Sequence, residues 1–217
     1  MKPQLTIKRL IKAAKEFCLA ENQVEHSELY GVTDGKAIGT FVEHRFQNYL
    51  INRYNIIIGS SANGLDLPSI QCDIKVTSLK QPQSSCPYKE SKQKIYGLGY
   101  NLLVFVYQKS DNALTKKGIM NFVSCTFIDK SRTADYQTTK GIIDIIQRNG
   151  NSDDIFAFLI ERNIPADEIT LMQMAEELLQ SPPLIGYLTI SNALQWRLQY
   201  GRIVSLTTPI DGIVPII

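Results

Sequence analysis

The stretch at residues 65–78, Leu-Asp-Leu-Pro-Ser-Ile-Gln-Cys-Asp-Ile-Lys-Val-Thr-Ser, decides most of what the sequence indicates about the fold. Its second half, residues 70–77, has the alternation of apolar and polar side chains that predicts a β-strand. Successive side chains of a strand point to opposite faces. The two predicted faces are an apolar one, Cys72, Ile74 and Val76, and a polar one, Asp73, Lys75 and Thr77. The apolar face would pack into a core, which leaves a carboxylate and an ammonium side by side on the other.

Asp73 and Lys75 lie on a strand whose neighbours are predicted to be buried, and an unpaired buried charge is costly. A role in the hydrolysis of a phosphodiester would explain their presence there. Carboxylates bind Mg²⁺ together with water and phosphate oxygens, and a lysine orients the water and offsets developing negative charge. Asp66 lies seven residues before Asp73, across a Leu-Pro-Ser bend, and can return to the same site. The alternative is an ordinary Asp–Lys ion pair on a half-exposed strand.

These residues resemble the core motif of the PD-(D/E)xK nuclease superfamily, which includes most type II restriction endonucleases. In that motif an Asp is followed, after a short gap, by (Asp/Glu)-x-Lys on the next strand. Asp66 matches the first acid, Asp73 the second and Lys75 the lysine. The family often adds an acid from the preceding helix, and Glu43 has the corresponding place. One departure is the residue before Asp66, which is leucine where the motif has proline.

The resemblance covers about residues 35–107 and implies a fold of the α/β (α+β) class, a restriction-endonuclease-like core with a mixed central sheet flanked by helices. It implies Mg²⁺ as the cofactor, with Asp66, Asp73 and Glu43 as its ligands. It also implies that Lys75 positions the attacking water, and that a homodimer cuts double-stranded DNA at a specific sequence.

Some alternatives stay open beside this interpretation. Glu43 borders the apolar stripe of its helix, so a solvated flank position is the alternative for that residue. For the whole chain, the alternatives are a structure-directed nuclease of the same superfamily, for repair or junctions, and a non-catalytic DNA-binding protein.

The composition is that of an ordinary globular protein, with 217 residues, 44% hydrophobic and 20% charged. The net charge of +2 is small for a nucleic-acid-binding protein, so any DNA-binding surface must come from local placement of charge.

Only two histidines are present, which disfavours zinc hydrolases, Ser-His-Asp enzymes and nucleases with a histidine base. The four cysteines form no Cys-x-x-Cys pair and we recognise no secretory signal, which favours reduced thiols in a cytoplasmic protein. No apolar run approaches the ~20 residues of a membrane span.

Hydrophobic periodicity and turn residues predict the order of elements. Helices are expected at residues 5–20, 36–54, 88–96, 133–148, 152–162, 167–180 and 190–200. Strands are expected at 56–58, 70–77, 102–107 and 119–128, the last two joined by a turn at 108–112 and therefore antiparallel. We predict a nuclease core at residues 1–130 and a helical C-terminal lobe at 131–217, for DNA recognition or dimerisation, within one compact domain.

Two segments are candidates for contacting DNA. On the predicted helix at 190–200, one face would carry Gln195, Gln199 and Arg202, and these residue types suit adenine and guanine edges in the major groove. Arg197 would hold the DNA backbone. The loop near the predicted cutting site supplies the other candidates: Lys80, Gln81, Gln83, Ser84, Ser85, Lys92 and Gln93. An amphipathic surface helix without DNA contacts is the alternative for 190–200.

Overall fold

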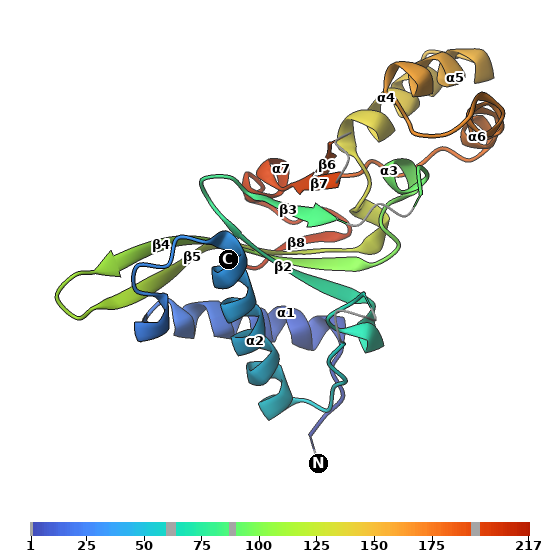
Figure 1. Cartoon of the computed structure of the whole chain (residues 1–217). Helices are drawn as coiled ribbons and strands as arrows, with labels where there is room; N and C mark the ends of the chain where they lie inside the picture. The colour runs from blue at the N-terminus through green and yellow to red at the C-terminus, as the bar shows by residue number, and fades with distance from the viewer. Residues whose placement is uncertain (1, 60–63, 87–89, 192–195) are drawn as a thin grey trace. The chain divides into compact units, whose positions relative to one another are not determined.

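The computed structural model describes residues 2–59, 64–86, 90–191 and 196–217. The chain forms two compact units, each assembled from segments that are far apart in the sequence (Figure 1). Unit 1 comprises Met1–Ser84, Asn101–Ile128 and Val204–Ile217, and unit 2 comprises Ser85–Tyr100 and Asp129–Ile203. None of the described helices is both long and apolar enough to span a membrane.

Unit 1 is built on a mixed sheet with the strand order β1-β5-β4-β2, in which β8 also pairs with β5. Its strands are β1 (Glu25–His26), β2 (Cys72–Ser78), β4 (Asn101–Asn112), β5 (Lys117–Ile128) and β8 (Ile213–Pro215). β2 and β4 are parallel, whereas the other pairs are antiparallel. The strands predicted at 70–77, 102–107 and 119–128 are confirmed, and so is the expected α/β class with a mixed sheet.

Two helices of unit 1 cover one face of this sheet (Figure 1): α1 (Ile7–Glu21) and α2 (Gly35–Arg53). Thr6 caps the first and Asp34 the second, because their side-chain oxygens accept N–H bonds from the first helical turn. An aromatic cluster joins the helices to the sheet. The ring of Phe46 lies 5.0 Å from that of Phe17 and 5.0 Å from that of Phe105 on β4. Both predicted helices, 5–20 and 36–54, are confirmed.

Unit 2 contains a group of helices and a small sheet. The helices are α3 (Gln93–Tyr96), α4 (Tyr136–Gln147), α5 (Ser152–Glu161), α6 (Glu168–Gln180) and α7 (Gly201–Val204), whose last residue falls in unit 1. The sheet has the order β3-β7-β6, with strands β3 (Gln83–Cys86), which begins in unit 1, β6 (Thr189–Ile190) and β7 (Trp196–Gln199). The helices predicted at 133–148, 152–162 and 167–180 are confirmed. The chain also has three described 3-10 helices. η1 (Ser27–Leu29) and η2 (Pro68–Ile70) belong to unit 1, and η3 (Lys130–Arg132) belongs to unit 2.

The predicted strand at 56–58 is wrong. Within the described part of the chain these residues pair with no strand, and the preceding Asn55 forms only an isolated bridge with Gln4. Ile56 and Ile58 pack against the core while Ile57 is 71% exposed. The isoleucines thus alternate in exposure as in a strand, but none of the described strands pairs with them, and β2 is the end strand of the described sheet.

The predicted turn at 108–112 is also wrong, because β4 continues to Asn112 and pairs there with Lys117. Backbone pairing in an antiparallel hairpin does not require apolar side chains, so a polar segment can extend a strand beyond the core. The turn comes later, where Asn112 Oδ1 accepts the N–H groups of Leu114 and Thr115.

The predicted helices at 88–96 and 190–200 need correction. The first is only α3, the last turn before Gly97, and residues 87–89 lie outside the described part. The described part of the second is not helical, because β6 and β7 form an antiparallel pair there, and residues 192–195 lie outside the described part. From Arg197 to Tyr200 exposed and buried residues alternate, the period of a strand, and the polar–apolar alternation of these residues is the signal that was missed.

Candidate active site

A tight turn brings Asp66 back to the start of β2. Leu67 and Cys72 pair through their backbones, the N–H of each donating to the carbonyl of the other at 2.9 and 3.1 Å. Between them η2 begins at Pro68, and Gln71 ends it in the left-handed conformation, with φ 48°. The bend predicted after Asp66 is therefore a closed loop that returns the chain to its own strand.

The Asp66 carboxylate satisfies a backbone donor at the edge of the sheet. β2 is the end strand of the order β1-β5-β4-β2, so every second N–H of β2 points away from β4 and needs another acceptor. The N–H of Ile74 is one of these, and it donates to Asp66 Oδ2 at 2.7 Å. The carboxylate is thereby held beside the backbone between Asp73 and Lys75.

Asp73 and Lys75 project from the face of β2 opposite to the core. Cys72 and Ile74 are 0% and 3% exposed and pack with the residues of α1 and α2. On the other face Lys75 Nζ lies 2.6 Å from Asp73 Oδ2, with 20% and 10% of the two side chains exposed. The predicted division of the strand into an apolar and a polar face is confirmed, and the polar face carries a close, mostly buried ion pair.

The carboxyl groups of Asp66 and Asp73 are in contact with each other. Burial raises the pKa of Asp66 most strongly, and a hydrogen bond with Asp73 and the charge of Asp73 raise it further, to about 8. The charge of Glu43 adds to the rise, whereas the Ile74 N–H lowers the pKa. Two carboxyl groups in contact repel one another when both are ionised, so the site favours a proton or a cation between them.

Glu43 lies on α2, the helix that packs against β2. A Cβ at Gly39 would lie 3.8 Å from the carbonyl oxygen of Val76 on β2, so the helix runs close to the strand at this glycine. One turn after Glu43, Gln47 Nε2 donates to Glu43 Oε1 at 3.1 Å. The charge of Glu43 also raises the pKa of Asp66, but by less than burial and Asp73 do.

The donor set suits a hard divalent cation. Among the described residues no three His, Cys, Asp or Glu side chains are gathered as a metal site. Mg²⁺ does not need three, because it is commonly held by one or two carboxylates together with waters and substrate phosphate oxygens. The contact of Asp66 with Asp73 provides such a pair. Burial, and after it the neighbouring Asp73, raises the pKa of Asp66, and a bound cation would favour the ionised form of both carboxyl groups.

The DNA-contact candidates that precede β3 or lie on it have different exposures. Lys80, Gln81 and Ser85 are exposed, whereas Gln83 and Ser84 are half-buried. The backbone N–H of Gln83 donates to Thr77 Oγ1 at 3.0 Å, which fastens the start of β3 to the end of β2. Thr77 therefore has a defined structural role at the end of the polar face.

The remaining candidates lie in unit 2 or outside the described residues. Gln93 is only 5% exposed, and Lys92 Nζ lies 3.9 Å from Glu177 Oε2. Arg197 and Gln199 are exposed on β7. The Arg202 guanidinium lies over the ring of Tyr136, 3.5 Å from its centroid. Gln195 falls within 192–195, which the structure does not describe.

Two supporting groups were missed from the sequence. The Ile74 N–H is a backbone donor and has no counterpart in the residue pattern. Gln47 had a usable signal, because it follows Glu43 by four residues on a predicted helix, and side chains at that spacing are neighbours.

The mixed sheet flanked by helices is the architecture of a restriction-endonuclease-like core. Comparison with known proteins is more specific. The sequence profile of the family "Type II restriction enzyme NspV" matches residues 4–215. The chain is 49% identical over 212 residues to the type II restriction enzyme NspV of Nostoc sp. (strain ATCC 29411 / PCC 7524), covering 98% of this chain and 96% of that protein. The chain belongs to the NspV family of type II restriction enzymes. No solved structure matches it.

Proposed function

We propose that this chain is a Mg²⁺-dependent endonuclease that hydrolyses double-stranded DNA at a specific sequence. The observation that carries the proposal is the contact of Asp66 with Asp73, directly beside Lys75, at the start of β2. Membership of the type II restriction enzyme family supports sequence-specific cutting. Two hydrophilic carboxyl groups and a lysine in a mostly buried site are costly without such a task.

In this proposal Asp66 and Asp73 hold the metal ion. When bound, Mg²⁺ would neutralise the phosphate and lower the pKa of a water molecule. Lys75 stays next to Asp73, orients the attacking water and offsets the negative charge that develops on the phosphate oxygens. The Ile74 N–H keeps one oxygen of Asp66 fixed, so that the carboxylate does not have to be ordered when the substrate binds.

Glu43 is proposed as a third acid of the site. Its charge already raises the pKa of Asp66, and Gln47 holds one of its oxygens. We propose that it joins Asp66 and Asp73 around the metal ion, either directly or through a water molecule.

The proposal extends to assembly and place of action. A homodimer would present one site to each strand of a symmetric target. We propose that the enzyme acts in the cytoplasm, and its cysteines support this, because Cys18, Cys72, Cys86 and Cys125 are all free and buried.

A plasmid digest tests the cutting activity. The wild type should convert unmethylated plasmid DNA to discrete fragments with Mg²⁺ and leave it intact with a chelator. Asp73→Asn should lower the rate by at least ~10²-fold, as expected for loss of a group that stabilises the transition state. Asp153→Asn is the matched control, because Asp153 is an exposed acid on α5, and it should cut like the wild type. Full cutting by Asp73→Asn would contradict the proposal.

A further inference from the structure

The small sheet of unit 2 has one buried and one exposed face. β6 and β7 are antiparallel, with Ile190 opposite Leu198 and Thr189 opposite Gln199. Ile190 and Leu198 are 3% and 0% exposed. Gln199 is exposed and Thr189 half-buried, so this second pair lies on the outer face, as the alternation of a strand requires.

Arg197 belongs to the same outer face, two residues before Gln199, and is exposed. Its backbone is fixed at both polar groups: Ser191 Oγ accepts its N–H at 3.1 Å, and its carbonyl accepts the Ser191 N–H at 3.1 Å. Arg197 is the only charged residue of the described strands β3, β7 and β6, so this sheet places no carboxylate beside it. The exposed face of β7 thus carries one positive charge and hydrogen-bonding side chains on a strand whose backbone is fixed. Such a face suits an anionic ligand that has planar hydrogen-bonding groups.

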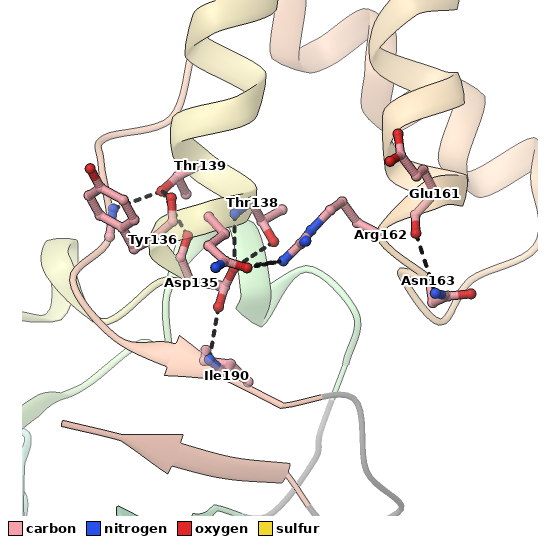
Figure 2. Close-up of polar contacts among 10 residues, drawn as sticks. Asp135, Tyr136, Thr138, Thr139, Glu161, Arg162, Asn163 and Ile190 are labelled. Atoms are coloured by element: carbon pink, nitrogen blue, oxygen red, sulfur yellow. Dashed lines mark hydrogen bonds and ion pairs between the residues drawn. The ribbon is translucent and has the colours of Figure 1, made fainter. Parts of the chain in front are cut away.

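A buried carboxylate anchors the other side of β6 to α4 (Figure 2). Asp135 is 1% exposed and caps α4, its Oδ1 accepting the Thr138 N–H at 2.8 Å and the Thr138 hydroxyl at 2.7 Å. Its Oδ2 accepts the Ile190 N–H at 2.8 Å. Tyr136 N–H also donates to the carbonyl of Leu188 at 2.8 Å, just before β6. Hydrogen bonds therefore attach the pair β6–β7 to the first turn of α4.

We propose that the outer face of β6 and β7 recognises bases of duplex DNA in the major groove, with Arg197 and Gln199 as specificity-determining residues and Asp135 as a positioning residue. The inference deepens the proposed function, since it takes duplex DNA as the ligand. In the major groove arginine pairs in bidentate fashion with guanine, and glutamine with adenine. β7 presents both of these side chains from the middle of the sheet β3-β7-β6.

The spacing of the two side chains sets what they contact. Residues two apart on a strand are separated by ~7 Å, which is about two base-pair steps of ~3.4 Å. Arg197 and Gln199 should therefore act on different base pairs of the target. Because Ser191 and Asp135 hold the strand pair, its side chains need little ordering on binding, a property that sharpens discrimination.

The test is a binding selection that does not require cutting. Each protein, in Ca²⁺ in place of Mg²⁺, is mixed with a library of duplexes that carry a randomised segment, and the bound duplexes are sequenced. The variants are Arg197→Gln, Arg197→Lys, which keeps the charge but removes the planar fork, and Gln199→Ala. The matched control is Arg148→Gln, since Arg148 is an exposed arginine elsewhere in unit 2. Thermal unfolding checks that every variant is as stable as the wild type.

We expect the wild type to enrich one sequence. Both Arg197 variants should lose preference at one G·C position by about tenfold to a hundredfold, and Gln199→Ala at a different, A·T position. Arg148→Gln should select the wild-type sequence. The proposal is overturned by unchanged preferences in the Arg197 and Gln199 variants, by a uniform loss of affinity at all sequences, which marks a phosphate contact, or by a wild type that selects no sequence.

A parallel digest separates this inference from the proposed function. The selected duplex is incubated with the wild type and Mg²⁺. A protein that selects a sequence through Arg197 but never cuts it contradicts the nuclease proposal and supports the recognition face. A protein that cuts specifically while its Arg197 and Gln199 variants keep the same specificity contradicts the recognition face alone.

Discussion

The carboxylate of Asp66 accepts a hydrogen bond of 2.7 Å from the backbone N–H of Ile74. This bond joins the loop before η2 to the edge strand, at the point between Asp73 and Lys75. The carboxylate therefore has a structural task, which is to satisfy an edge donor, beside the proposed one of binding metal. An amide oxygen can take over the first task but carries no charge for the second, so Asp66→Asn separates the two.

Asp66→Asn should remove a pH dependence from the stability of the metal-free protein. The carboxyl titrates near 3.8 in the unfolded chain and near 8 in the folded one, so the folded state binds an additional proton between these values. Stability from this group is fully present below about pH 4 and is lost as the pH rises toward 8. Thermal unfolding in chelator across this range should show a steeper decline of the midpoint for the wild type than for Asp66→Asn. Parallel curves for the two proteins would contradict the raised pKa.

Lys75→Met should separate metal binding from cutting. Lys75 Nζ lies 2.6 Å from Asp73 Oδ2, so its removal takes a positive charge away from the metal ligands and should leave Ca²⁺ affinity equal or higher. Cutting with Mg²⁺ should still fall by at least ~10²-fold, because the charge that develops on the phosphate loses its stabilising partner.

Calorimetric titration with Ca²⁺ and a plasmid digest measure these two effects. Asp73→Asn should lose both metal binding and cutting. Lys12→Met is the control, because the Lys12 side chain is 75% exposed on α1, and it should lose neither. Weaker Ca²⁺ binding by Lys75→Met would show that the lysine supports the metal site instead.

The strands and helices of unit 1 could largely be predicted because side-chain burial shapes them. The alternation of apolar and polar residues at 70–77 predicts that Asp73 and Lys75 lie on the polar face of β2. The three- and four-residue spacing of apolar residues predicts α2. The isoleucines at 56–58 alternate in the same way, but a strand also needs a partner strand, and backbone pairing depends on distant segments.

The side chains of the candidate site could be chosen from the sequence, but the backbone donor between them could not. Asp66, Asp73 and Lys75 carry recognisable chemistry at a recognisable spacing, whereas the Ile74 donor follows from β2 being an edge strand, which only the sheet order reveals. In unit 2 the stretch around Arg197 fits a helical spacing of polar residues as well as a strand. Its pairing with β6, fixed by Asp135 from another segment, decides between the two.

Asp135→Ala should destabilise the protein more than the loss of an ordinary helix cap. The side chain accepts bonds from Thr138 and Ile190 and is almost wholly buried, so its removal leaves buried donors unsatisfied at about 1–3 kcal/mol beyond the cap itself. Asp167→Ala is the matched control, because Asp167 caps α6 in the same way but is exposed, and should cost about 0.5–2 kcal/mol. Urea unfolding measures both. Equal losses would show that the contact with β6 adds no stability.

Glu43→Gln should weaken metal binding without unfolding the protein. The substitution keeps an oxygen for the bond from Gln47 but removes the negative charge that acts on Asp66. We expect Ca²⁺ affinity to fall by about 10–100-fold, the range typical of groups that support metal ligands, and the pKa of Asp66 to fall as well, since one repelling charge is gone. Calorimetry gives the affinity, and the pH dependence of thermal unfolding in chelator gives the shift. Gln47→Ala leaves the charge in place and should reduce the affinity much less. If Glu43→Gln binds Ca²⁺ like the wild type, Glu43 is a solvated flank of α2 and the site consists of Asp66, Asp73 and Lys75 alone.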